Sequence, residues 1–213
     1  MAGGYEFHRP NHTNLSRTKT KKLVKVYSEL DYDLGIISPQ VTDLLTDSEK
    51  EQVSDWRETT NSVQTRILDY QDHKLGILIF PELNKNSNGK TKGIHKEIVK
   101  KARELRPRVN LLIGISPWGN FPEDKFLTNN PPVLDILLGS GSGPHMTGKF
   151  LQDKKTVWVR PLSKGKTISQ ITIPCWPKKN TNHVWKPNKN ITTNLILLKG
   201  DIPADPKISS YLQ

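Results

Sequence analysis

The chain has 213 residues, enough for one large domain or two small ones and for a sizeable buried core. Apolar residues make up 34% of it, and five Trp, five Tyr and five Phe are spread along it, which places it outside the disordered class. It has no apolar stretch of roughly 18 residues that could span a membrane, and no apolar N-terminal segment typical of a secretory signal. The single cysteine, Cys175, excludes an internal disulfide and a zinc site built from cysteines.

The net charge of +11 is concentrated in one segment. Residues 148–200 contain eleven Lys and Arg but a single acid, Asp153, whereas the first 147 residues are close to balanced. Such a segment attracts nucleic acid, acidic lipid or another anion, although a solvated basic surface would have the same composition. The candidate polyanion-binding residues in this segment are Lys154, Lys155, Arg160, Lys164, Lys166 and Trp158.

Residues 1–15 are expected to be irregular, and the first regular elements follow them. Ser16 can cap a helix in which Leu23, Tyr27 and Leu30 share one face. In chain order, the elements expected in the first half are a helix over 17–30, a short strand over 32–37, a polar helix or loop over 47–59, and a hairpin with strands over 65–70 and 75–80.

The second half alternates helices with apolar strands. Residues 91–105 have the apolar periodicity of a helix, and VNLLIGI over 109–115 has the continuous apolar character of a strand buried on both faces. The remaining elements are a short helix over 121–128 and strands over 134–138, 156–160, 167–173 and 193–198.

This alternation predicts how the central strands pair. Strands 75–80, 109–115 and 133–138 should be parallel neighbours in one sheet, because right-handed crossovers join consecutive strands in this arrangement. Helix 91–105 should pack across one face of that sheet. We therefore expect one α/β domain over residues 1–213, with a basic, β-rich part over 148–200.

In open α/β sheets, ligands bind beyond the carboxyl ends of the strands. This rule selects three loops, at 38–43, 116–120 and 139–145. The glycines of the third loop would let backbone N–H groups approach an anion, or would simply form a tight turn. The candidate pocket residues are Ser38, Gln40, Asp43, Ser116, Trp118, Asn120, Ser140, Ser142 and His145.

No catalytic constellation can be assembled from the nucleophilic and imidazole side chains. Of the six His, only His8 and His12 are spaced like metal ligands, and only His145 falls in a candidate loop. Cys175 lies between Pro174 and Trp176 and is expected to pack as a small apolar side chain rather than to act as a nucleophile.

The order of motifs from residue 110 onward resembles the second half of calcineurin-like metallophosphoesterase domains of the 5′-nucleotidase branch. In that family a buried strand ends in a His-containing loop, and a short helix, a strand leading into Gly-His-x-His and two closing strands follow. Here these segments read LLIGISPWGN, FPEDKFL, LDILLGSGSG and KKTVWVRPLSKGKTISQITI. The resemblance extends upstream to about residue 20, through KKLVKVYSELDYDLGIISPQVTDLL and DHKLGILIFPEL, and downstream through NLILLKGDIPADPKISSYLQ. It implies a β-sheet sandwich flanked by helices and two-metal hydrolysis of phosphoesters.

The family's metal-ligand motifs are absent from the matching positions. The Gly-Asn-His-Glu motif falls on Ser38 to Val41, the histidine of the middle loop falls on Pro117, and the histidines of Gly-His-x-His fall on Gly141 and Gly143. The motif of the bridging aspartate falls on residues 1–4, MAGG, and the family's first Asp-x-His strand would precede Met1, so the expected fold lacks that strand. Of these residues only Gln40 has a side chain that resembles a ligand, and it is a poor one.

Three functions are compatible with these features. The first is a degenerate phosphoesterase-fold protein without hydrolase activity that acts as a binding or structural module. The second is an active hydrolase with substitute ligands drawn from Asp43, Asn120, Glu123, Asp124 and His145. The third is a basic module for nucleic acid or another polyanion, in which Trp158, Trp176 and Trp185 stack on bases, although tryptophans at these positions can equally pack between strands.

These hypotheses set the expected cofactors and partners. We expect no cofactor, and a divalent metal only if the substitute ligands work. The sequence does not determine the partner, although the positive charge favours an anionic ligand or a nucleic acid. The compartment is open as well: relatives in the family are mostly exported, so a chain truncated before Met1 would be expected in the periplasm or outside the cell.

Overall fold

The computed structural model describes residues 17–30, 32–37, 39–53, 56–83, 91–162, 166–179 and 183–212. The chain forms two compact units, one from the chain up to Thr59 together with Lys199–Gln213, and the other from Thr60–Leu198. The C-terminal segment therefore groups with the N-terminal one. The segment expected to be irregular, 1–15, lies outside the described residues.

The smaller unit is built around helix α1 (Arg17–Glu29). Its C-terminal helix α6 (Pro206–Leu212) contacts α1 through Glu29, which forms an ion pair with Lys207 and accepts a hydrogen bond of 2.9 Å from the Tyr211 hydroxyl. A capping box of Thr46 and Glu49 begins helix α3. The other elements are α2 (Pro39–Thr42), α3 (Asp47–Gln52) and the parallel pair β1 (Gly35–Ile37) and β2 (Trp56–Glu58).

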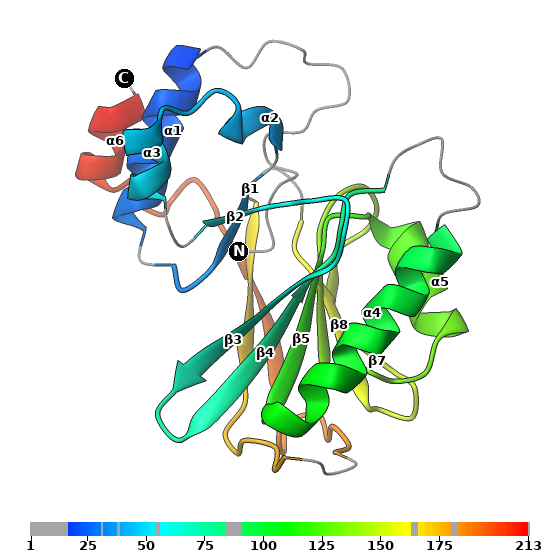
Figure 1. Ribbon diagram of the computed structural model, residues 1–213. Helices are drawn as coiled ribbons and strands as arrows, with labels where there is room; N and C mark the ends of the chain where they lie inside the picture. The colour runs from blue at the N-terminus through cyan, green and yellow to red at the C-terminus, as the bar shows by residue number, and fades with distance from the viewer. Residues whose placement is uncertain are drawn as a thin grey trace. The chain divides into compact units, whose positions relative to one another are not determined.

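The larger unit contains a six-stranded sheet in the order β3-β4-β5-β6-β8-β7. Strands β4, β5, β6 and β8 run parallel, and the edge strands β3 and β7 run antiparallel to their neighbours (Figure 1). The strands are β3 (Gln64–Tyr70), β4 (His73–Ile79), β5 (Leu111–Ser116), β6 (Ile136–Gly139), β7 (Met146–Leu151) and β8 (Thr156–Arg160).

The two faces of this sheet have separate cores. On one face, Leu112, Leu137 and Trp158 pack with helix α4 (Thr91–Leu105) and helix α5 (Asn120–Asn129). On the other face, β9 (Thr167–Thr172) and β10 (Thr192–Leu197) form an antiparallel pair, and this side buries apolar residues that include Trp185. The unit is therefore layered, with helices, central sheet and strand pair in succession (Figure 1).

The structure confirms the pairing expected for the central strands. Leu75 of β4 pairs with Leu111 of β5, and Ile113 of β5 pairs with Ile136 of β6, in parallel in both cases. Helix α4 has the expected bounds and buries Ile98 and Ala102 against the sheet. The elements not expected from the sequence are β2, α2, β7, the 3₁₀ turn η1 (Arg106–Arg108) and α6, which are short or weakly apolar.

Within the described part of the chain, the helices are too short and too polar to span a bilayer. The thiol of Cys175, expected to be packed, is exposed instead, because Pro174 and Cys175 lie in a bend between β9 and the loop that follows it.

Candidate functional site

Two of the three candidate loops meet at the carboxyl ends of β5 and β6. Backbone hydrogen bonds join them directly: Ser140 N donates to Ser116 O at 2.8 Å, Gly119 N to Ser140 O at 2.9 Å, and Asn120 N to Ser142 O at 2.8 Å. The Ser140 hydroxyl also donates to Ser116 O at 3.0 Å. The loops therefore continue the pairing of β5 with β6 beyond the ends of the strands.

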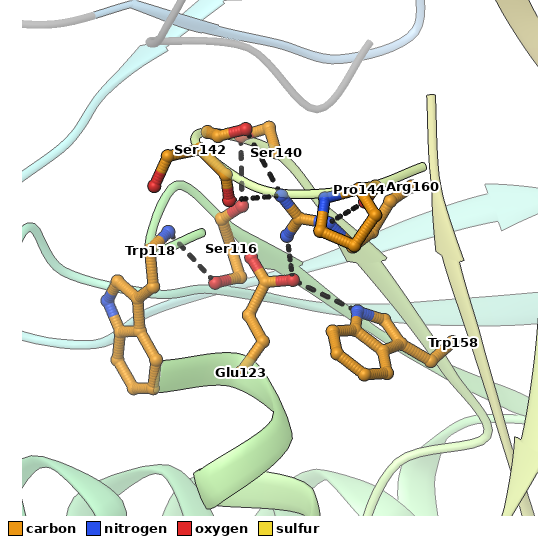
Figure 2. A network of polar contacts seen from close by, with 9 residues as sticks. Ser116, Trp118, Glu123, Ser140, Ser142, Pro144, Trp158 and Arg160 are labelled. Carbon is orange, nitrogen blue, oxygen red and sulfur yellow. Dashed lines mark hydrogen bonds and ion pairs between the residues drawn. The ribbon is translucent and has the colours of Figure 1, made fainter. Parts of the chain in front are cut away.

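A buried ion pair lies beneath these loops (Figure 2). Arg160, at the end of β8, pairs through Nη1 with Glu123 Oε2 of helix α5, and the two side chains are 2% and 0% exposed. The indole Nε1 of Trp158 donates to the same carboxylate oxygen at 2.9 Å. Glu123 is thereby held from two positions on one strand, because Trp158 and Arg160 point to the same face of β8.

The rest of the guanidinium holds the glycine-rich loop. Arg160 Nη2 donates to the carbonyl oxygens of Gly141 at 3.1 Å and Ser142 at 3.0 Å, and Nε donates to Pro144 O at 3.2 Å. Figure 2 shows these carbonyl groups arranged around the guanidinium, with Glu123 on its other side. A single cation therefore organises the loop that joins β6 to β7.

Burial raises the pKa of the Glu123 carboxyl, and the Arg160 guanidinium opposes that rise. The cost of placing a carboxylate in the interior is compensated only by its partners, since a buried charge without a partner is strongly unfavourable. Removing either partner would leave the other charge buried and unsatisfied. Stable folding at this site therefore requires both Arg160 and Glu123.

The close packing of the loops explains two of the glycines. A Cβ atom at Gly139 would lie 2.1 Å from Glu123 Oε2 and 2.9 Å from Arg160 Cγ, so the buried pair fits only against a residue without a side chain. Gly143 has a φ of +115°, and a Cβ there would lie 2.4 Å from the Cβ of Asn120. The glycine-rich loop therefore packs closely against Glu123, Arg160 and Asn120.

The residues at this site do not fit a pair of metal ions. Pro117, Gly141 and Gly143 stand where the resemblance places histidine ligands, and they have no ligating side chain. Across the described residues, no group of three or more His, Cys, Asp and Glu side chains is arranged to hold an ion. Glu123, the buried carboxylate at these loops, already has a guanidinium as its partner.

Four further candidates lie in these two loops. Ser116 and Trp118 are buried; the Trp118 N–H donates to Ser116 Oγ at 3.2 Å, and its indole donates to Pro81 O at 2.6 Å. Ser142 and His145 are exposed at the surface of the glycine-rich loop. The two loops thus bring together Ser116, Trp118, Asn120, Ser140 and Ser142.

The third candidate loop belongs to the smaller unit. Gln40 lies in the short helix α2, and Asp43 follows it with an exposed side chain. Ser38 lies outside the described residues.

The candidate polyanion-binding residues divide into buried and exposed groups. Trp158 and Arg160 are 0% and 1% exposed, so neither side chain lies on a surface that a polyanion reaches. Lys154 and Lys166 are exposed and Lys155 is half-buried, whereas Lys164 lies outside the described residues. Of the other two tryptophans, Trp185 is buried in the core and Trp176 is half-buried.

From the sequence, Glu123 was a candidate substitute ligand and Arg160 a candidate polyanion-binding residue, and nothing in the sequence related the two. A signal was present in TVWVR, where an arginine ends a strand that is otherwise apolar. Arginine is almost never fully buried unless it is paired, so such a position indicates a buried acidic partner elsewhere in the chain. The sequence does not identify that partner, because Glu123 lies 37 residues away.

Solved structures resemble this fold, although no family model and no curated protein sequence matches the chain. A calcineurin-like phosphoesterase, YfkN, from Bacillus subtilis aligns with a TM-score of 0.58 at 15% identity, covering 90% of this chain and 71% of that one. A 5′-nucleotidase from Candida albicans aligns with a TM-score of 0.52 at 13% identity, covering 84% of this chain and 39% of that one. The resemblance to calcineurin-like metallophosphoesterases of the 5′-nucleotidase branch is thus confirmed for the fold, and the chain has the fold of that superfamily.

Proposed function

We propose that this chain is a phosphoesterase-fold protein that does not hydrolyse phosphoesters with two metal ions, and that it acts as a binding or structural module. In this proposal it has no resident metal. The β/α framework keeps its layered form, while the loops at the carboxyl ends of the strands are held together by side-chain and backbone contacts of the chain itself.

The buried pair of Arg160 and Glu123 supports this proposal most strongly. Two-metal hydrolysis requires two ions about 3.5–4 Å apart, held by several carboxylate, amide and imidazole groups. Here a guanidinium contacts one carboxylate and three carbonyl oxygens. The guanidinium thus occupies Glu123 Oε2 and the loop carbonyl groups that an ion would otherwise contact.

The alternative, an active hydrolase with substitute ligands, has weaker support. Glu123 is engaged by Arg160, and Asp124 forms an ion pair of 3.4 Å with Lys149. Asp43 and His145 are exposed side chains that belong to different compact units. Asn120 would contribute only an amide oxygen. One loosely held ion is the most that such a set would provide.

The test is turnover of a chromogenic phosphoester and of nucleoside monophosphates, with Mn²⁺ or Zn²⁺ added. We expect no turnover above a blank that contains the metal alone. Metal-stimulated turnover that is lost in His145→Ala or Asp43→Ala, but kept in the matched control His73→Ala, would establish the alternative. His73 is a suitable control because it lies at the start of β4, at the other end of the sheet.

A further inference from the structure

Five loops of the larger unit gather at the amino ends of the parallel strands, opposite to the candidate site (Figure 1). They comprise residues 70–74, 106–110, 152–155, 174–179 and 183–190, and we call them the amino-end face. The β3–β4 turn, the segment before β5 and the β7–β8 turn each lead into a parallel strand. The remaining two segments are both parts of the single connection between β9 and β10.

Hydrogen bonds hold these loops to one another. The side chain of Asn110 links three of them, because its Oδ1 accepts from Lys74 N at 3.0 Å and its Nδ2 donates to Pro177 O at 3.2 Å. Trp185 N donates to Lys154 O at 2.8 Å, and the Trp185 indole is buried and donates to Asp135 O at 3.0 Å. The face is therefore a preformed surface.

This face carries a large excess of positive charge. Its only acids are Asp72 and Asp153. Two of its cations are neutralised by acids outside it, since Lys74 pairs with Asp69, and Arg106 with Asp135 at 2.8 Å. The Lys and Arg residues of the face are Lys74, Arg106, Arg108, Lys154, Lys155, Lys178, Lys179, Lys186 and Lys189. The face thus has nine Lys and Arg side chains against two acids.

An aromatic stack lies beside these cations. The ring of Trp176 is stacked with His73 at a centroid distance of 4.7 Å and with Tyr70 at 6.0 Å. Trp176 also packs against the core, whereas Tyr70 is 55% exposed. Lys178 and Lys179 follow Trp176 directly in the chain and are exposed. The face therefore combines an anchored aromatic surface with exposed cationic side chains.

We propose that the amino-end face binds single-stranded nucleic acid. Proteins that bind single strands combine a positive surface for the phosphates with aromatic rings on which bases stack. A membrane is a poorer fit, because one exposed aliphatic side chain, Val184, lies on this face, whereas Ile168, Ile196 and Leu197 lie at the far end of the β9–β10 pair, away from these loops. The face is separate from the candidate site, so its role does not depend on whether phosphoesters are hydrolysed.

The experiment is fluorescence anisotropy of a labelled single-stranded oligonucleotide titrated with the full chain. Lys178→Glu/Lys179→Glu should weaken binding on the order of tenfold at low salt. It should also make the slope of log affinity against log salt shallower by about 1.4, since each lost phosphate contact removes about 0.7. Tyr70→Ala should weaken binding by about fivefold or more through the loss of stacking.

The matched control is Lys96→Glu/Lys100→Glu on helix α4, which makes the same charge change on exposed side chains elsewhere in the unit. It should change the affinity by less than about twofold, an effect of net charge alone. An equal loss in both double variants would overturn the proposal, as would no binding at micromolar protein in low salt. So would tighter binding to phosphatidylserine vesicles than to the oligonucleotide, or an affinity unchanged by Tyr70→Ala.

Discussion

Charged side chains are buried and paired at the carboxyl ends of the parallel strands, but most are exposed at the amino ends of the same strands. At the carboxyl ends, one guanidinium and one carboxylate are buried; they pair with each other, and the guanidinium also donates to carbonyl oxygens of the surrounding loop. At the amino ends, Lys and Arg side chains gather on loops that hydrogen bonds hold in place, and most of them face solvent. The candidate catalytic end is thus closed by internal contacts, while the opposite end presents its charge outward.

This difference shows why position along the sheet does not by itself identify a functional surface. A buried charge must be fully partnered within the chain, so it has little capacity left for a ligand. An exposed charge contributes little to stability, so its partner can be another molecule. The comparison therefore predicts that substitutions at the carboxyl ends change folding and that substitutions at the amino ends change binding.

The largest expected effect comes from breaking the buried pair. Arg160→Met should lower the free energy of unfolding by about 3–5 kcal/mol, because it leaves the Glu123 carboxylate buried without its partner. Urea denaturation measures this. The exposed pair at the other end provides the control: Lys74→Met removes the partner of Asp69 and should cost less than about 1 kcal/mol.

The double variant Arg160→Met/Glu123→Leu sharpens the same test. Replacing both charges removes the unpaired carboxylate, so the double variant should be more stable than Arg160→Met alone. If the loss of stability in the double variant equals the sum of the losses in Arg160→Met alone and Glu123→Leu alone, the two residues are not coupled. The contrast between the two ends of the sheet would then fail.

A smaller effect is expected from filling the space beside the pair. Gly139→Ala should destabilise the chain by about 1–3 kcal/mol, because its Cβ would overlap the Glu123 carboxylate. Gly93→Ala is the matched control, since Gly93 lies in helix α4 and a Cβ there meets nothing within 4 Å. That substitution should stabilise the chain by about 0.8–1.0 kcal/mol. Equal effects of the two substitutions in thermal melts would mean that the loop is not closely packed.

The smallest expected effect concerns pH. The ring of His95 in α4 is stacked with that of Trp118 in the 116–120 loop, at a centroid distance of 5.7 Å. Burial lowers the pKa of His95, and the charge of Lys125 lowers it further. The folded chain therefore keeps His95 neutral where the unfolded chain protonates it, so stability falls as the pH drops below about 6.5. In His95→Phe this decline should become shallower, as followed by urea denaturation between neutral and mildly acidic pH. An unchanged decline would place the acid sensitivity elsewhere, for instance at His183, whose pKa burial also lowers.

The sheet could be predicted because its signals are local. The continuous apolar character of VNLLIGI and LDILL and the helical periodicity of 91–105 predicted two strands and a helix, and together with strand 75–80 they predicted the parallel order. The short elements of the smaller unit could not be obtained in this way, since β2 pairs with β1 across 21 residues and α6 packs on α1 across most of the chain. Such contacts depend on tertiary packing rather than on periodicity.

The loops of the candidate site could be predicted from the sequence, but the ion pair beneath them could not, because it too depends on tertiary packing. The rule that ligands bind at the carboxyl ends of strands selected the loops that contain Ser116 and Ser140, and in the structure these loops are joined by hydrogen bonds. The chemistry of these loops depends on Glu123 and Arg160, which local sequence marks as ordinary polar residues of a helix and a strand end. Only the fold shows that the helix α5 carboxylate and the end of β8 meet beneath one loop.

The most direct test of the central claim is a calorimetric titration of the chain with Mn²⁺. If Arg160 and Glu123 stand in place of a metal centre, no saturable heat of binding should appear. The chain should also gain no thermal stability from the metal, whereas a native-state site would be stabilised by about 2.7 kcal/mol at a hundredfold excess over Kd. Saturable binding of two ions per chain that is lost in His145→Ala but kept in His73→Ala would contradict the account.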